Sequence, residues 1–319
     1  KYGNGETVTQ TFDSRGNLLS ITENGQKTTM TYDGSDNLTA IHSPDGSVVS
    51  YTYDAQGRRT SVSDGVYTTG YQYDSQGRVA AVTDGSSPLV TYTYDSDGRL
   101  SRQQNANGTY TQYSYSGDQL ASIVHYDAAG AVLSSYAYTY DSQGHVTSLK
   151  EPAGTWRYTY DAAGQLTQAT APDGTVTTYT YDAAGNRTAK TTDGKTTNYT
   201  ANSLNQYTAY GEVRRTYDQN GNVLTEQKGG QTARYTWNAQ GQLTGYTDFD
   251  GTVYQYGYDA FGLRNRVTVN GETTRYVNDP LGDGYALAAY GSFGEQHYAL
   301  AGMLTAARTG DEMYFYHSN

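Results

Sequence analysis

The 319-residue chain contains no cysteine and only five prolines, three methionines and two tryptophans. Without cysteine it can form neither disulfides nor thiolate metal sites. No apolar run approaches the ~20 residues that a helix needs to span a bilayer. No leader peptide is present, but the chain opens inside a repeat at Lys1, so we expect a fragment of a longer polypeptide. These absences fit a secreted bacterial protein stabilised by its sheet, although cysteine-free cytoplasmic proteins also exist.

Positive charge is scarce as well. There are 21 Lys and Arg residues against 32 Asp and Glu, a net charge of −11, so phosphates would be repelled and nucleic acid is excluded as a partner. The mean hydropathy of −0.76 and the paucity of Leu, Ile and Phe would ordinarily predict disorder. The 35 tyrosines reverse that prediction, because each ring buries apolar area while its hydroxyl keeps a hydrogen-bond partner. Together with Thr and Val, they favour an ordered β protein.

One short unit returns along the chain. Residues 51–58 read YTYDAQGR, and close copies begin at Tyr71 and Tyr92, 20 and 21 residues further on. Looser copies lie at 138–145, 158–165, 179–186 and 256–263. A fixed period of this length is typical of repeat architectures. The signature residues are Tyr51, Tyr53, Asp54, Gly57, Arg58, Tyr71, Tyr73, Asp74, Gly77, Arg78, Tyr92, Tyr94, Asp95, Gly98, Arg99, Tyr138, Tyr140, Asp141, Gly144, Tyr158, Tyr160, Asp161, Gly164, Tyr179, Tyr181, Asp182, Gly185, Tyr256, Tyr258, Asp259 and Gly262.

Two kinds of turn alternate with strand-like runs. In residues 13–16, the Asp13 side chain can accept a backbone hydrogen bond from two residues on, and Gly16 tolerates positive φ. Residues 17–23 and 26–32 then read as strands around Asn24-Gly25. Since no apolar stripe persists at helical spacing, we predict an all-β fold of antiparallel hairpins. The second turn recurs at Asp45-Gly46, Asp64-Gly65, Asp84-Gly85, Asn107-Gly108, Asp173-Gly174, Asp193-Gly194, Asp250-Gly251 and Asn270-Gly271.

The apolar residues after each turn glycine lie three apart, as Leu38 and Ile41 do. A flat strand cannot place both on one face, so we expect a bulge that curves the sheet. Strand alternation puts Tyr51 and Tyr53 on one face, where tyrosines of adjacent repeats can pack across the sheet. Arg58 could either pair with an acidic turn or lie flat on a neighbouring tyrosine ring.

Several copies depart from the pattern. Asp36 stands where glycine is expected, residues 113–117 lose the Asp and are one residue short, and residues 121–135 contain an insertion. From Tyr276 the spacing loosens, although 279–282 still read as a turn, and 285–290 and 314–317 as strands. We predict one continuous domain over 1–319, more regular over 1–275 and degenerate over 276–319.

These residues resemble the YD repeat of the Rhs (rearrangement hotspot) family, whose signature is Tyr-x-Tyr-Asp-x-x-Gly-Arg followed by Leu-Thr and a later Asp-Gly. Residues 53–58 and 94–100 match it closely, and about a dozen copies cover essentially the whole chain. The family includes bacterial Rhs effectors, wall-associated toxins, the shell components of Tc toxins and animal teneurins. The resemblance implies an extended sheet that spirals into a hollow shell, which in the toxin branches encloses a C-terminal toxic domain. Residues 315–319 resemble the segment that leads into the Rhs core.

Candidate chemical sites are weak. The resemblance suggests aspartyl self-cleavage at Asp279-Pro280-Leu281-Gly282, but that reaction needs a second carboxylate motif and none follows, so we predict a turn. The acidic turns at 33–37 and 95–98 lack the Glu that usually completes a calcium loop. His42, His125, His145, His297 and His317 have no metal spacing; His145 replaces the usual Arg as a surface or stacking residue. Without a nucleophile elbow or phosphate loop, we expect no catalytic, cofactor or metal residues.

The sequence therefore predicts a non-enzymatic shell segment of a large exported bacterial protein, secreted or at the cell surface, which encloses or presents a toxin or other cargo domain of the same polypeptide. The net charge suggests an acidic lining and cargo of opposite charge. One alternative is an adhesin whose tyrosine ladders stack on cell-surface glycans; another is a repeat fibre. A delivery-system component is a further candidate partner.

Overall fold

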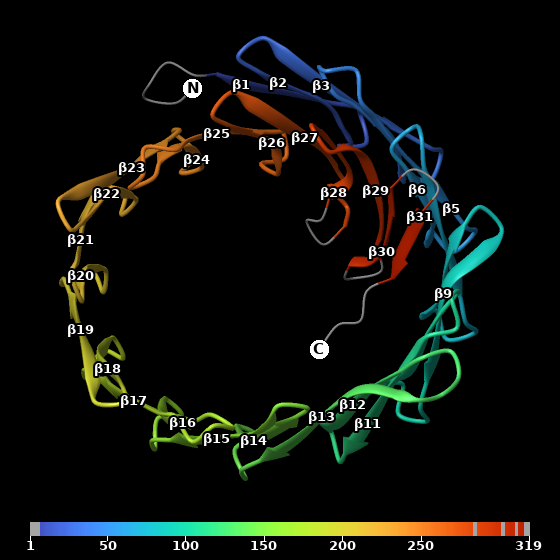
Figure 1. The fold of residues 1–319 in the computed structure, drawn as a ribbon. Coiled ribbons are helices and arrows are strands. Elements are labelled where there is room, and N and C mark those ends of the chain that lie inside the picture. Colours follow the sequence, from blue (N-terminus) through green and yellow to red (C-terminus); the bar gives the residue numbers. More distant parts are fainter. Residues whose placement is uncertain (1–6, 283–285, 301–303, 310–311, 316–319) are drawn as a thin grey trace. The chain divides into compact units, whose positions relative to one another are not determined.

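The computed structural model describes residues 7–282, 286–300, 304–309 and 312–315. Within these residues the chain forms 31 strands and no helix (Figure 1). The strands belong to one sheet in which consecutive strands pair, and hairpins such as β5–β6 and β25–β26 are antiparallel. The predicted all-β hairpin repeat is confirmed. The described residues form no helix that is long and apolar enough to cross a membrane.

The strands are short and follow one another closely. Their bounds are β1 (Val8–Phe12), β2 (Leu18–Glu23), β3 (Gln26–Tyr32), β4 (Leu38–His42), β5 (Val48–Tyr53), β6 (Arg59–Ser63), β7 (Thr68–Tyr73), β8 (Val79–Asp84), β9 (Ser87–Tyr94), β10 (Leu100–Asn105), β11 (Tyr110–Ser116), β12 (Gln119–Tyr126), β13 (Val132–Tyr140), β14 (Val146–Glu151), β15 (Gly154–Tyr160), β16 (Leu166–Thr170), β17 (Val176–Tyr181), β18 (Arg187–Thr192), β19 (Lys195–Ala201), β20 (Tyr207–Tyr210), β21 (Val213–Tyr217), β22 (Val223–Lys228), β23 (Gln231–Trp237), β24 (Leu243–Thr247), β25 (Val253–Tyr258), β26 (Arg264–Val269), β27 (Glu272–Asn278), β28 (Ala286–Gly291), β29 (Gly294–Leu300), β30 (Leu304–Thr309) and β31 (Glu312–Phe315).

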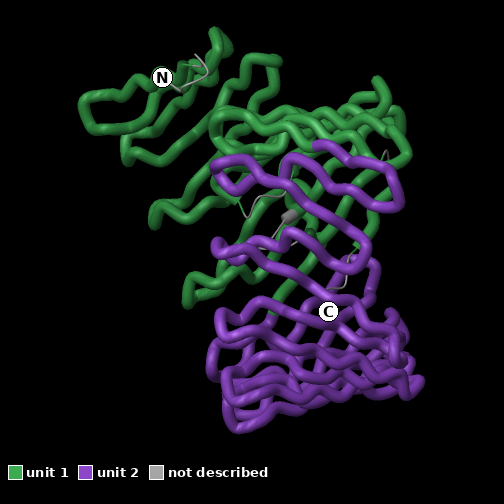
Figure 2. Tube along the Cα trace, turned by 90° about the vertical axis from the view of Figure 1, so that its left-hand side faces the viewer, with its two compact units in different colours: residues 1–92, 235–316 green, residues 93–234, 317–319 purple. Residues whose placement is uncertain are grey.

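The chain divides into two compact units, coloured separately in Figure 2. The first unit contains the described residues of 1–92 and 235–316, and the second contains those of 93–234. The boundaries fall inside strands β9 and β23. A single domain over 1–319 stays a prediction.

The Asp/Asn-Gly pairs, expected to form one kind of turn, form several, of which two recur. At Asn24-Gly25 both residues have positive φ, 48° and 80°, and Glu23 pairs with Gln26, which is the two-residue hairpin turn that asparagine and glycine favour. Asp193-Gly194 and Asn270-Gly271 are built alike. At Asp45-Gly46, by contrast, the glycine ends a wider loop closed by a Ser43 N–H bond to the Ser47 carbonyl. The loops holding Asn107-Gly108, Asp173-Gly174 and Asp250-Gly251 close in the same way.

The predicted bulge is present in each regular hairpin. Tyr32 pairs with Leu38 and Thr31 with Ala40, so Thr39 is the extra residue, and the same shift separates Thr52 from Tyr53 in β5–β6. The bulge brings Leu38 and Ile41 to the same side of the sheet, where Ile41 belongs to the hydrophobic cluster and Leu38 packs against it. Irregular spacing after the turn glycine is therefore part of the repeat.

The irregular copies are accommodated locally. Asp36 takes the left-handed conformation of the glycine that it replaces, with φ 67°. The short copy at 113–117 closes through Gly117-Asp118, with Ser116 opposite Gln119. The insertion lengthens β12 and β13, which are joined by the loop at Asp127. Strand β28 covers 286–290 and strand β31 covers 314–315; Tyr285, Tyr316 and His317 lie outside the described residues.

The hydrophobic core lies in the first unit. Ile41, Val62, Val82 and Val90 are almost fully buried, and Leu287, Ala299 and Ala306 from the C-terminal strands join the same cluster. Tyr92 on β9 reaches Thr305 on β30, so β28–β31 form a second layer over the N-terminal repeats. Small side chains on β28 and β30 allow the two layers to approach closely.

Candidate functional site

The repeat corner of residues 54–58 is built around the carboxylate of Asp54. Its Oδ1 accepts the backbone N–H groups of Gln56 (3.0 Å) and Arg58 (2.9 Å), while Oδ2 accepts the Arg58 Nε–H at 2.7 Å. The Gly57 N–H donates to the Asp54 carbonyl at 3.0 Å, and Gly57 has φ 76°. The loop thus needs an acceptor first and a residue tolerant of positive φ fourth.

The other signature aspartates make the same two backbone contacts. Those of Asp95 go to Asp97 and Arg99, and the hydrogen bond from the Arg99 side chain, with the backbone bonds, holds the pKa of Asp95 below its ordinary value. The same bonds recur at Asp74, Asp141, Asp161, Asp182 and Asp259. The accompanying glycines, Gly77, Gly98, Gly144, Gly164, Gly185 and Gly262, all have positive φ.

The second tyrosine of each unit joins its repeat to the preceding one. The Tyr53 hydroxyl donates to the Leu38 carbonyl at 2.8 Å, and the Tyr160 hydroxyl to the Val146 carbonyl at 2.8 Å. The ring therefore packs on the neighbouring repeat while its hydroxyl satisfies a backbone acceptor. Equivalent bonds are made by Tyr32, Tyr73, Tyr115, Tyr140, Tyr181, Tyr217 and Tyr258.

Arg58 makes both of the contacts that the sequence left open. Besides its bond to Asp54, its guanidinium carbon lies 4.6 Å from the centre of the Tyr73 ring. Arg99 lies 4.4 Å over Tyr115 in the same way. His145 takes this place in its own repeat, with Nδ1 3.0 Å from Asp141 Oδ2 and its ring stacked on Tyr160 at 4.8 Å.

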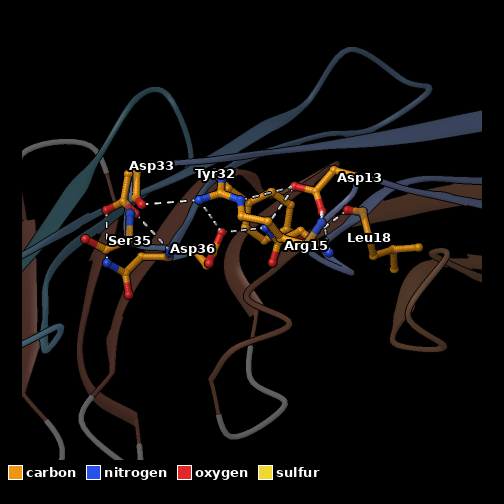
Figure 3. Close-up of polar contacts among 10 residues, drawn as sticks. Asp13, Arg15, Leu18, Tyr32, Asp33, Ser35 and Asp36 are labelled. Atoms are coloured by element: carbon orange, nitrogen blue, oxygen red, sulfur yellow. Dashed lines mark hydrogen bonds and ion pairs between the residues drawn. The ribbon is translucent and has the colours of Figure 1, made fainter.

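Successive corners also contact one another along the sheet edge. Figure 3 shows Arg15 of the first corner reaching the second, where its Nη1 donates to the Gly34 carbonyl (3.2 Å) and pairs with Asp36 Oδ1 (2.9 Å). The Asn17 amide also donates to Asp36, at 2.7 Å. The signature residues are therefore spread along an edge as a ladder and are not gathered in one site.

The first tyrosine of the repeat unit differs in burial from one repeat to the next. Tyr51 and Tyr71 are 3% and 7% exposed, whereas Tyr138, Tyr158, Tyr179 and Tyr256 are half-buried. Burial raises the pKa of the Tyr71 hydroxyl to about 12. The position of the repeat along the chain decides whether this ring is covered.

Asp279 of the predicted turn is a buried anchor between layers. The turn itself forms, since the Gly282 N–H donates to the Asp279 carbonyl at 3.1 Å. The side chain of Asp279 is 1% exposed; it accepts the Tyr51 hydroxyl at 2.8 Å and pairs with Arg59. Arg59 in turn lies 5.1 Å over the Tyr71 ring. Desolvation, followed by the charge of Asp279, raises the pKa of Tyr51. Sequence reasoning missed this contact, because neither Asp279 nor Arg59 breaks the local pattern.

His297 forms a second polar contact between the layers. Its Nδ1 lies 2.6 Å from Asp64 Oδ2 and its Nε2 2.5 Å from Glu295 Oε1, and the ring lies 5.8 Å from that of Tyr67. His125 is buried against Thr111 at 2.9 Å, and His42 is exposed. Although His297, Asp64 and Glu295 are in contact, no group of three or more His, Asp or Glu side chains within the described ranges is arranged to hold a metal ion.

These features define a hairpin-repeat wall in which Tyr-Asp corners form one edge. The family model of the teneurin YD-shell matches residues 1–157 and 150–277. The chain belongs to the teneurin YD-shell family, which agrees with the resemblance to YD repeats. A search of curated proteins found no match.

Solved structures show the same fold at low sequence identity. A crystal structure of TcdB2–TccC3 without its hypervariable C-terminal region is 14% identical with a TM-score of 0.54, covering 94% of this chain and 21% of that one. The Photorhabdus luminescens Tc holotoxin pore, with a substituted TccC3, is 15% identical with a TM-score of 0.51, covering 95% and 22%. The chain thus spans about a fifth of the length of these solved chains.

Proposed function

We propose that the chain is a non-enzymatic segment of the wall of a large exported YD-repeat protein, which encloses or presents a toxin or other cargo domain of the same polypeptide. The observation that carries the proposal is the use of the signature side chains. Asp54 is occupied by its own loop, Tyr53 by the preceding repeat and Arg58 by both Asp54 and Tyr73. The motif thus builds a continuous surface and leaves no group poised for chemistry.

Two further points support enclosure. One neighbour in fold is a Tc holotoxin pore by name, and the other is described as lacking a hypervariable C-terminal region. The chain carries a net charge of −11, so we propose a cargo with excess positive charge, attracted electrostatically at moderate ionic strength. An acidic cargo domain would contradict this. Export to the medium or the cell surface of a bacterium is part of the same proposal.

Limited proteolysis of the full polypeptide that contains this chain tests enclosure. The cargo segment should resist protease in the wild type and become cleavable in Asp279→Ala, which breaks the contact between layers. Asp161→Ala removes a half-buried corner carboxylate that bonds to its own loop, and should leave the protection in place. Cleavage of the cargo segment at equal rates in all three proteins would refute enclosure.

A glycan-binding adhesin remains the second candidate, because Tyr138, Tyr158 and Tyr179 keep part of their rings accessible in the second unit. Stacking on sugars would require those faces. A glycan array probed with the wild type and with Tyr158→Ala separates the two functions: binding that is lost on substitution favours the adhesin, and no binding at all favours the wall.

A further inference from the structure

Arginine replaces an aliphatic residue at one position of the repeat. In many hairpins the residue that pairs with the second tyrosine is leucine or valine, namely Leu38, Val79, Leu120, Val146, Leu166 and Val223. In β5–β6 it is Arg59, in β17–β18 it is Arg187, and in β25–β26 it is Arg264. A charged residue in place of an apolar one costs stability unless it is paired. Such a departure from the repeat therefore points to a function.

In the first unit, Arg59 is paired with the covering layer. Its Nη1 pairs with Asp279 Oδ2, and the Tyr51 hydroxyl donates to Asp279 Oδ1 at 2.8 Å. The Arg59 guanidinium carbon lies 5.9 Å from the centre of the Tyr51 ring and 5.1 Å from that of the Tyr71 ring. Two tyrosines thus position the arginine, and one carboxylate from the turn between β27 and β28 satisfies both the arginine and a tyrosine hydroxyl.

Arg187 of the second unit has the same aromatic surroundings in its own sheet. Its guanidinium carbon lies 4.8 Å from the centre of the Tyr179 ring and 5.6 Å from that of the Tyr199 ring. Both tyrosines stand at the same sequence spacing from their arginine as the two tyrosines beside Arg59 do. The arrangement of an arginine between two rings is therefore repeated in β17–β19.

No carboxylate of the described residues reaches Arg187. Its Nε is buried without a hydrogen-bond partner, and its side chain forms no ion pair within the described part of the chain. The hydroxyls of Tyr199 and Tyr181 interact with the guanidinium, but a tyrosine hydroxyl is uncharged at neutral pH. The Tyr179 hydroxyl, which corresponds to that of Tyr51, makes no hydrogen bond with a described residue either. Both groups that hold Asp279 in the first unit therefore have counterparts available in the second.

A second cation lies on the same face of the sheet. Lys190 stands directly opposite Tyr179 in the β17–β18 ladder, and the next residue across is Thr197. Lys190 forms no ion pair with any residue that the structure describes. In the first unit the residue opposite Tyr51 is the buried Val62. A chain with a net charge of −11 thus presents two unpaired cations on one face of a single hairpin, which favours an acidic partner.

We propose that Arg187, Lys190 and the Tyr179 hydroxyl bind an acidic turn of a second polypeptide layer, supplied by a part of the same polypeptide outside this chain. The turn presents an Asp or Glu carboxylate to the Arg187 Nη groups and the Tyr179 hydroxyl, as the turn at Asp279 does in the first unit. The inference rests on the proposal that the chain is a segment of a longer wall. It does not rest on enclosure of a cargo, so protease sensitivity of the cargo segment would leave it standing.

Photo-cross-linking in the full polypeptide tests for the covering segment. Benzoylphenylalanine in place of Thr197 lies on the face of Arg187 and Lys190, whereas in place of Thr178 it lies on the opposite face, because neighbouring residues of a strand alternate. On irradiation, position 197 should cross-link to a segment outside residues 1–319 that contains Asp or Glu, and position 178 should not. No cross-link at 197, a cross-link to a second, isotope-labelled copy, or one to a segment without Asp or Glu would overturn the proposal.

Charge reversal separates binding from local packing. Arg187→Glu should lower the yield of the cross-link about tenfold or more, because a charge-assisted hydrogen bond is lost. Replacing the carboxylate residue of the cross-linked segment with arginine should restore the yield in the Arg187→Glu protein; an arginine that only packs on its tyrosines would show no such rescue. Arg157→Glu makes the same change at an exposed arginine of the other face and should leave the yield unchanged. An unchanged yield in Arg187→Glu, or no rescue, would refute the proposed contact.

Discussion

Hairpins β5–β8 of the first unit and β15–β18 of the second have the same corner motif, but one face of the sheet is buried to different extents in the two. In β5–β8, Tyr51, Val62, Tyr71 and Val82 are between 0% and 7% exposed. In β15–β18 the tyrosines of the same positions, Tyr158 and Tyr179, are half-buried. The carboxylate bonds of the corner nevertheless recur in both. The corner therefore depends on residues that are close together in the sequence. Burial of the tyrosine-bearing face depends on residues elsewhere in the chain.

The covered face depends on the C-terminal strands of the first unit. Leu287, Ala299 and Ala306 join the cluster that contains Ile41 and Val82. The corresponding tyrosines of the second unit, Tyr158 and Tyr179, do not belong to this cluster. Because local stability follows buried apolar contact, we expect the two sets of repeats to differ in stability although their motif is the same.

The largest effect should come from Asp279→Ala. The substitution leaves Arg59 without its carboxylate and the buried Tyr51 hydroxyl without its acceptor. Breaking such a pair should cost about 4 kcal/mol of the free energy of unfolding. Hydrogen exchange followed by mass spectrometry should show faster exchange in β5–β8 and β28–β31 and unchanged exchange in β15–β18.

Asp161→Ala is the matched control for the second unit. It removes a half-buried corner carboxylate whose hydrogen bonds go to its own loop, so its effect should be smaller and confined to β15 and β16. If both substitutions accelerated exchange in β5–β8 equally, the dependence of that face on Asp279 would be wrong.

A smaller loss of stability is expected when the apolar residue that pairs with the first tyrosine position of the repeat unit is replaced by alanine. Ile41 is 2% exposed, whereas Leu149, which pairs with Tyr138, is half-buried. Ile41→Ala should cost about 3 kcal/mol through lost burial and the cavity left behind, and Leu149→Ala about 1 kcal/mol. Urea unfolding monitored by tyrosine fluorescence measures both. Equal losses would show that the second unit has a cover of its own.

The corner could be predicted from sequence because its contacts are close along the chain. Asp54, Gly57 and Arg58 fall within one loop, and Tyr53 bonds only 15 residues back. The spacing of Leu38 and Ile41 likewise predicted the bulge, since the period of a strand is fixed. Propensity and periodicity report such local constraints directly.

The contact between layers could not be predicted in this way. Tyr51 and Asp279 are 228 positions apart, and His297 and Asp64 are 233 apart. Asp279 reads as an ordinary turn residue and His297 as an isolated histidine, because each also satisfies a local pattern. Which repeats are covered depends on which of them contact the C-terminal strands, and no residue of the motif encodes that.

The smallest effect should be common to both units. Hydrogen bonds from the Asn37 and Arg99 side chains, with backbone bonds, lower the pKa values of Asp33 and Asp95 from 3.8. A carboxyl group with a lowered folded-state pKa contributes stability that is present above pH 3.8 and is lost as the pH falls through the folded value. NMR titration should therefore give midpoints below 3.8 for Asp33 of the first unit and Asp95 of the second, and stability should decline below about pH 4. Asp95→Asn should remove the share of that decline due to Asp95. A midpoint near 3.8 for Asp95 alone would contradict the prediction that the corners of the two units are equivalent, because the same hydrogen bonds would then stabilise the first unit and not the second.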